Sequence, residues 1–231
     1  MSKTSKNVLG DQRGQIGKVV GKVVDGVQMY SAYTDAVRNP RTPKQIAHRA
    51  RFAAAVKLGK SIKGALMVGL RETASKRKLT SAFNIFVKKN MGSITYNAET
   101  ALVTIDYQHV CLAEGDTPFV GFTGVSFSEA LKVTATYSPN DDIPGSRDDD
   151  SVYVVVYAPG LGMSVMAIGE RSAGTVTVEV PGAYGGEVVH VWGFVKTSVE
   201  DVVQVESYGI TLKPDMCSNS SYIGTGTVLA E

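Results

Sequence analysis

Hydrophobic positions follow two different periods along this chain, and the change falls near residue 92. Before it, the longest apolar pattern repeats every three to four residues, which places side chains on one face of a helix. After it, short runs rich in Val, Thr and Tyr alternate with polar positions, as in strands. The pattern therefore predicts an α+β protein whose helices precede its main sheets.

The first β-prone segment is predicted to be a hairpin near residues 16–33. The runs VGKVV and VQMYSAY flank the pair Asp25-Gly26. An Asp-Gly pair between two such runs favours a two-residue turn, because both turn positions adopt positive φ. The neighbouring glycines lack the spacing of a phosphate-binding loop, so we assign them to bends.

The stretch NPRTPKQIAHRARF, residues 39–52, predicts a helix that begins at Pro43. Thr42 is suited to the N-cap, and proline at the first helical position loses no hydrogen bond. Gln45 can reach back to the backbone of Thr42 and complete a capping box. The start of this helix is thus specified by local chemistry alone.

Two further helices are expected after it. Gly59 should break or bend the first helix, with a second running from about Ser61 to Arg71. A short third helix is predicted near residues 81–89, ended by Asn90 and Gly92 in the left-handed conformation. Its apolar face would consist of Phe83, Phe86 and Val87.

The remainder of the chain predicts about seven or eight strands. Their spacing favours an antiparallel β-sandwich of immunoglobulin-like kind. We therefore expect a basic assembly domain at residues 1–92 with a hairpin and helices, an acidic sandwich at 93–213, and a Ser/Gly/Thr-rich tail at 214–231. The tail could pair onto a neighbouring molecule.

Charge is segregated between the two parts of the chain. Residues 1–90 carry 19 Lys and Arg against 4 Asp and Glu, a net charge of +15, and residues 91–231 carry 5 against 18, a net charge of −13. A basic segment attracts nucleic acid or acidic protein surfaces, and copies arranged head to tail would pair opposite charges. Contact between copies is the favoured interpretation.

Basic side chains on and after the predicted helices form the candidate partner-binding surface. Its members are Lys44, Arg49, Arg51, Lys57, Lys60, Lys63, Arg71, Lys76, Arg77 and Lys78. Such a set could also neutralise a nucleic-acid backbone without reading its sequence. Phe52 is the only aromatic residue of the segment 43–71, which argues against a platform for stacking single-stranded bases.

The chain contains residue types that bind metals or act in catalysis, but they lack the spacing that metal sites and catalytic motifs require. His48, His109 and His190 lack metal-ligand spacing, and the nucleophile motif G-x-S-x-G is absent. Cys111 and Cys217 are expected to be free thiols. The sequence therefore predicts no catalytic residue, no metal and no cofactor, and it contains no apolar run long enough to span a membrane.

An acidic loop is expected within residues 141–150. Its carboxylates are Asp141, Asp142, Asp148, Asp149 and Asp150. We interpret them as solvated side chains, because their spacing differs from that of an EF-hand. Calcium binding and docking of a basic partner are the alternatives.

Several blocks of the chain resemble a family of uncharacterised proteins encoded by Bacteroidetes genomes and their phages. The motif NPRT-x-x-Q-x-x-x-R-x-x-F, here Asn39 to Phe52, is similar to segments of phage structural proteins, and virion proteins of crAss-like phages are among the possible relatives. The other blocks that carry the resemblance are GQIGKVVG, LTSAFNIFVKKN, RSAGTVTVEVPGAYGGEVVHVWGFV and SYGITL. The resemblance implies a virion component and brings no catalytic residues with it.

Two functions are consistent with these features. The first is a non-enzymatic virion structural protein, assembled in the host cytoplasm as a ring or other oligomer at the head–tail junction or in the tail. Its partners would be further copies and the portal, tail or capsid proteins. The second is a non-specific nucleic-acid-binding protein that uses the basic half.

Overall fold

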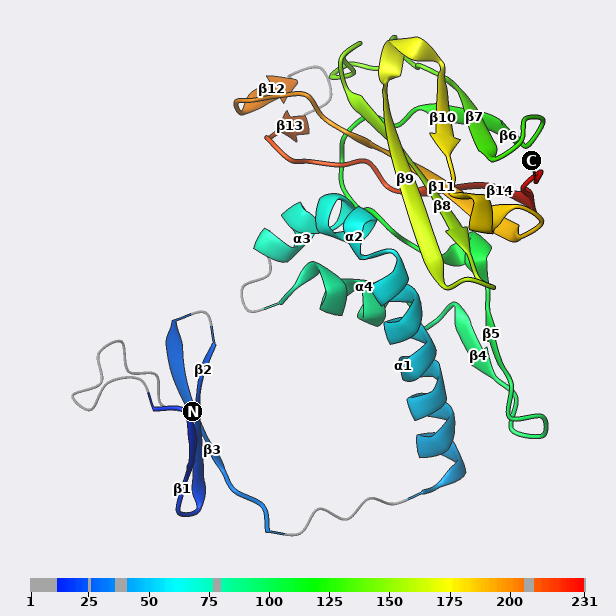
Figure 1. The fold of residues 1–231 in the computed structure, drawn as a ribbon. Coiled ribbons are helices and arrows are strands. Elements are labelled where there is room, and N and C mark those ends of the chain that lie inside the picture. Colours follow the sequence, from blue (N-terminus) through cyan, green and yellow to red (C-terminus); the bar gives the residue numbers. More distant parts are fainter. Residues whose placement is uncertain (1–11, 25, 36–40, 77–79, 206–209, 231) are drawn as a thin grey trace. The chain divides into compact units, whose positions relative to one another are not determined.

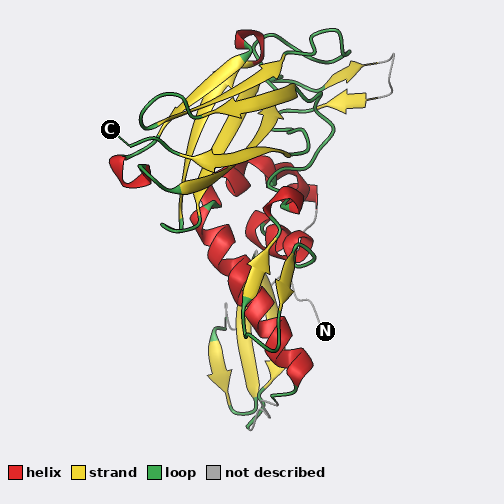
Figure 2. Ribbon diagram, turned by 90° about the vertical axis from the view of Figure 1, so that its right-hand side faces the viewer, coloured by secondary structure: helices red, strands yellow, loops and turns green. Residues whose placement is uncertain are grey.

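The computed structural model of the protein describes residues 12–24, 26–35, 41–76, 80–205 and 210–230. It is a mixed helix-and-sheet structure with several antiparallel sheets (Figures 1 and 2). The chain divides into two compact units, residues 1–45 and 46–231. Among the described residues, no helix is both long enough and apolar enough to cross a membrane.

The first unit contains a three-stranded antiparallel sheet in the order β1-β2-β3. Its strands are β1 (Gly14–Ile16), β2 (Val19–Val24) and β3 (Val27–Ala32). The predicted hairpin is confirmed, since Val24 pairs with Val27 and Gly26 has the positive φ, 74°, that the tight turn requires. Asp25 lies outside the described residues.

Helix α1 (Pro43–Ser61) begins at the predicted residue. The amide of Gln45 donates to Thr42 Oγ1 at 3.4 Å, and the amide of Thr42 donates to Gln45 Oε1 at 3.3 Å. This reciprocal pair is a capping box, as expected. Residues 39 and 40 of the motif lie outside the described part of the chain.

The expected break at Gly59 is wrong, because α1 continues through it. A Cβ atom on Gly59 would lie 2.9 Å from a ring carbon of Phe86 and 3.0 Å from one of Phe83. The glycine therefore allows close approach of two phenylalanine rings and does not end the helix. The second helix expected from about Ser61 to Arg71 corresponds to α2 (Lys63–Gly69), and a further helix that was not expected, α3 (Arg71–Lys76), follows it.

Helix α4 (Ala82–Asn90) follows the N-cap Ser81, and Phe86 and Val87 on its expected apolar face are buried. The expected left-handed end is wrong, because neither Asn90 nor Gly92 has a positive φ. The buried amide side chain of Asn90 instead donates to the carbonyl of Cys111 at 3.0 Å and accepts from its amide at 2.7 Å. Asn90 thus joins α4 to the following loop.

Two larger antiparallel sheets dominate the second unit, with strand orders β10-β7-β6 and β14-β11-β8-β9. The first sheet contains β6 (Gly121–Ser126), β7 (Lys132–Ser138) and β10 (Thr175–Glu179). The second contains β8 (Ser151–Ala158), β9 (Met163–Glu170), β11 (Val188–Lys196) and β14 (Ser221–Thr227).

Strand β8 separates two hydrophobic cores. Successive side chains of a strand point to opposite faces. Val154 lies in the core shared by the two sheets, whereas Tyr153 and Val155 lie in the core shared with the helices. Burial on both faces explains the unbroken apolar run SVYVVVYA, which does not alternate as a half-exposed strand would.

Short elements connect these layers. They are the paired strands β4 (Ile94–Tyr96) and β5 (Val103–Ile105), the paired strands β12 (Val203–Val205) and β13 (Ile210–Leu212), and the 3-10 turns η1 (Tyr107–His109), η2 (Arg171–Ala173) and η3 (Gly182–Tyr184).

The compact units differ from the expected domains 1–92, 93–213 and 214–231. Helices α1, α2 and α4 contribute Leu58, Leu66 and Phe86 to a core that also contains Trp192 of β11, so the helices and the sheet form one unit. The expected tail contains β14, which pairs with β11 of the same chain. The strands consequently extend beyond residue 213.

Candidate functional site

Most of the expected basic surface is exposed on α1, α2 and α3. The exposed members are Lys44, Arg49, Lys57, Lys60, Lys63, Arg71 and Lys76. On α1, Arg49 and Lys60 are eleven residues apart, close to three full turns, and Lys57 is three residues from Lys60. These side chains therefore share one face of the helix.

Arg51 does not belong to that surface. Its side chain is partly buried, and its guanidinium Nη2 donates to the carbonyl oxygen of Met91, just after α4. Arg51 therefore ties α1 to the end of α4. Arg77 and Lys78 lie outside the described residues.

Arg71 and Lys76 are engaged in ion pairs within the chain. Arg71 Nη1 lies 3.6 Å from Asp215 Oδ2, and Lys196 Nζ lies 2.7 Å from Asp215 Oδ1. The hydrogen bond from Lys196 lowers the pKa of Asp215. Lys76 Nζ lies 2.8 Å from Glu72 Oε1, and this hydrogen bond raises the pKa of Lys76. Part of the basic charge is thus neutralised locally.

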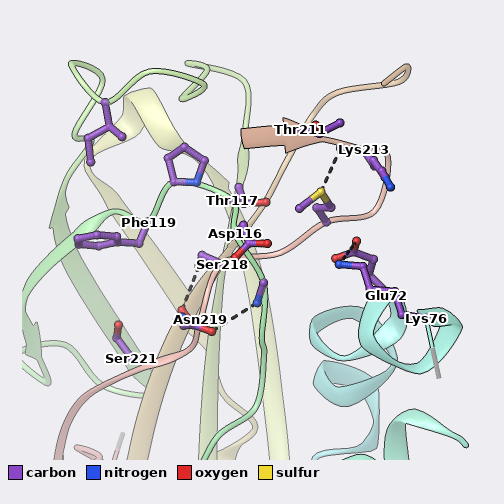
Figure 3. A pocket seen from close by; sticks show the side chains of 14 residues that line it. Glu72, Lys76, Asp116, Thr117, Phe119, Thr211, Lys213, Ser218, Asn219 and Ser221 are labelled. Carbon is purple, nitrogen blue, oxygen red and sulfur yellow. Dashed lines mark hydrogen bonds and ion pairs between the residues drawn. The ribbon is translucent and has the colours of Figure 1, made fainter. Parts of the chain in front are cut away.

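A cavity of about 850 Å³ opens beside α3 (Figure 3). Figure 3 shows Glu72 and Lys76 on one wall and Phe119 on the opposite one. Its lining residues are Glu72, Lys76, Gly115, Asp116, Thr117, Pro118, Phe119, Ile143, Thr211, Lys213, Met216, Ser218, Asn219 and Ser221. Two carboxylates and two ammonium groups balance its charge.

The polar side chains of this cavity mainly form hydrogen bonds with backbone atoms. Ser218 Oγ accepts from the amide of Val195 at 2.9 Å and donates to the carbonyl of Asn219 at 3.0 Å. Asn219 Oδ1 accepts from the amide of Gly115 at 3.4 Å. The buried hydroxyl of Thr117 has no hydrogen-bond partner among the described residues. Sequence reasoning missed this cavity because its walls come from four segments that are distant in the sequence and share no motif.

A buried ion pair was also missed. Arg171 Nη2 lies 3.1 Å from Asp150 Oδ2, and neither side chain is exposed. Arg171 Nη1 donates to the carbonyl of Pro139 at 2.7 Å, and the amide of Ser198 donates to Asp150 Oδ1 at 2.9 Å. The pair joins loops that are far apart in sequence. No sequence pattern around Arg171 indicates this role.

The acidic loop is therefore only partly solvated. Asp150 is buried, which corrects its assignment as a solvated side chain. Asp149 Oδ1 accepts from Ser198 Oγ at 2.7 Å and from Arg147 Nε at 3.2 Å, and the bond from Ser198 lowers the pKa of Asp149. Within the described ranges, no group of three or more His, Cys, Asp or Glu residues could hold a metal ion. The arrangement of this loop therefore lends no support to the calcium alternative.

The three histidines lie on separate elements: His48 on α1, His109 in η1 and His190 on β11. His190 is half-buried, as expected for a sheet residue, and burial lowers its pKa. Its ring stacks on Tyr107 with 3.9 Å between centroids, and its Nδ1 lies 2.9 Å from the hydroxyl of Tyr222. These contacts give His190 a packing role.

Both cysteines are free thiols, as expected. Cys217 is buried, and burial raises the pKa of its thiol to about 12. A thiol with so high a pKa is protonated at neutral pH and is a poor nucleophile.

The N-terminal sheet exposes apolar side chains around a basic turn. Ile16 is 58% exposed and Val19 is 43% exposed. Lys18, between them in the turn from β1 to β2, is also exposed.

An acidic hollow of about 310 Å³ lies at the start of β12. Its lining residues are Arg147, Asp149, Ser198, Val199, Glu200, Asp201 and Val203. Three carboxylates face a single guanidinium, so the lining is negatively charged. Val202 and Val203 beside it are 61% and 41% exposed.

An apolar groove of about 300 Å³ runs between α1 and α4. It is lined by His48, Phe52, Phe83, Asn84, Val87, Lys88 and Met91. Phe52, the aromatic residue of the NPRT motif, is 48% exposed there. The groove therefore combines apolar walls with a basic rim.

A comparison with models of known protein families assigns the chain to one of them. Residues 11–209 match a family model described as a family of unknown function, DUF6266. The chain belongs to this family. The DUF6266 match covers the N-terminal sheet, helices α1 to α4 and the strands up to β12. Searches of curated proteins and of solved structures found no match.

Proposed function

We propose that this member of the DUF6266 family is a non-enzymatic structural protein of a bacteriophage virion that works as an oligomer, in a ring at the head–tail junction or in the tail. The carrying observation is the N-terminal sheet, which belongs to a compact unit of its own and in which the side chains of Ile16 and Val19 are exposed. A unit this small has little apolar surface of its own to bury, so burial of Ile16 and Val19 against a second surface would add to its stability. A second molecule that covers them would supply this burial.

The sequence resemblance of Asn39–Phe52 to phage structural proteins supports the virion setting, as does the opposite charge of the two parts of the chain. Within this proposal, the two large sheets form an immunoglobulin-like β-sandwich as the outer module. Their three and four antiparallel strands share one core, and seven strands is the number in a constant-type immunoglobulin domain.

The proposal is tested on the full chain by size-exclusion chromatography with light scattering, at low and high salt, and by mass spectrometry of purified virions. A closed oligomer and a place among the virion proteins are expected, with the portal, tail or capsid proteins as neighbours. A monomer at every concentration, together with absence from virions, would refute the proposal.

A second candidate, non-specific nucleic-acid binding, is favoured by the shared exposed face of Arg49, Lys57 and Lys60. It predicts a DNA mobility shift that weakens steeply with salt, and loss of the shift on changing these three residues to Glu. Arg51 is left unchanged because its contact with Met91 would confound the result. No shift at low salt would exclude this function.

A further inference from the structure

The surface that would cover the N-terminal sheet must match both its apolar side chains and its charge. At the turn from β1 to β2, Lys18 stands between the exposed Ile16 and Val19. Arg13 and Lys22 add two exposed cations, and Asp35 is the one carboxylate among the described residues of this unit. The matching surface must therefore be apolar and acidic.

Three hollows of the second unit can be compared with this requirement. The groove between α1 and α4 is apolar, but His48 and Lys88 on its rim do not attract a basic turn. The cavity beside α3 carries two cations and two carboxylates, so it offers no net attraction. The acidic hollow has excess negative charge next to exposed valines. Of these three, only the acidic hollow satisfies both conditions.

We propose that the β1–β2 turn of one copy docks into the acidic hollow of a second copy. Lys18 would face Asp149, Glu200 and Asp201. The neighbouring Ile16 and Val19 would cover the exposed Val202 and Val203. The inference rests on the proposed oligomer and names its interface.

Each copy carries both surfaces, so the contact is head to tail. A contact of this kind closes into a ring when its rotation permits closure. The interface would combine apolar burial, which supplies affinity, with opposite charges, which select the partner surface and fix the register.

The test is sedimentation equilibrium of the full chain at physiological salt, with Lys18→Glu and Asp201→Lys as variants. Each should raise the dissociation constant of self-association about tenfold or more. An equimolar mixture of the two variants should associate more tightly than either alone. Only in mixed contacts does the carboxylate introduced by Lys18→Glu meet the ammonium group introduced by Asp201→Lys.

Lys88→Glu serves as the matched control for Lys18→Glu, because it also replaces a lysine with a glutamate, but on the rim of the α1–α4 groove. It should leave association unchanged. Circular dichroism checks that every variant is folded.

The outcomes separate the two proposals. If the wild type self-associates but neither Lys18→Glu nor Asp201→Lys weakens it, the docking contact is refuted and the oligomer stands. Weakening by Lys88→Glu alone would assign the contact to the α1–α4 groove and also refute the docking proposal. A wild type that stays monomeric at all concentrations overturns both.

Discussion

Arg171 and Asp150 form an ion pair whose side chains are entirely shielded from solvent, with 3.1 Å between Nη2 and Oδ2. The guanidinium exchanges water for the carbonyl oxygens of Pro118 and Pro139, and the carboxylate accepts from the amide of Ser198. Removing one partner of such a pair strongly lowers the free energy of unfolding, because the remaining charge is left buried without its partner.

Arg171→Met should accordingly lower the free energy of unfolding by about 3–5 kcal/mol. Urea denaturation followed by circular dichroism measures the loss. Arg147→Ala is the control, because it removes a half-exposed ion pair with Asp149 and should cost under about 1 kcal/mol. Equal effects of the two substitutions would contradict a structural role for the buried pair.

Gly59→Ala should destabilise the protein, although alanine is the better helix former. The added methyl group would overlap the rings of Phe86 and Phe83, and overpacking of a core costs about 1–3 kcal/mol. Gly64→Ala, in α2, meets no atom within 4 Å and should be neutral or stabilising by up to about 1 kcal/mol. Thermal denaturation of both variants measures these changes in stability. A higher melting temperature for Gly59→Ala than for the wild type would show that the two rings move aside at little cost.

Stability should fall as the pH drops below about 6.5, the ordinary pKa of histidine, in part because of His190. Burial lowers the pKa of His190 in the folded state, so the unfolded state binds the proton first. The loss grows from about pH 6.5 down to the lowered pKa and is then complete.

His190→Gln should remove this part of the pH dependence, as measured by urea midpoints across that window. The exposed His48, changed to Gln, provides the comparison. An unchanged pH profile in His190→Gln would rule out the expected contribution.

Deletion of residues 221–231 should abolish cooperative unfolding of the second unit. It removes β14, which pairs with β11, and the buried Val228. Deletion of residues 1–35 is the contrasting change, because it removes strands of the other compact unit. Differential scanning calorimetry should show a sharp transition for the second deletion and none for the first. A sharp transition in both would mean that β14 is dispensable.

Local features of this fold could be predicted from the sequence. The capping box of Thr42 and Gln45 and the turn at Gly26 depend on residues within four positions of one another. Their hydrogen bonds and dihedral angles are therefore set by the adjacent chain.

Features that depend on distant partners could not be predicted. A glycine such as Gly59 can end a helix or can allow a neighbouring ring to approach the helix closely. Here the packing of Phe86, 27 residues away in the sequence, shows that the second role applies. Asp150 belongs by composition to an acidic loop, yet Arg171 makes it a buried residue. The cavity beside α3 likewise arises only when separate segments meet.

Strand β8 contributes alternate side chains to both hydrophobic cores, Val154 to one and Val155 to the other. Loss of this strand from its sheet would therefore expose both cores at once, so neither can melt while the other persists. The second unit should behave as one cooperative folding unit, and its slowest amide hydrogen exchange should occur where β8 pairs with β11.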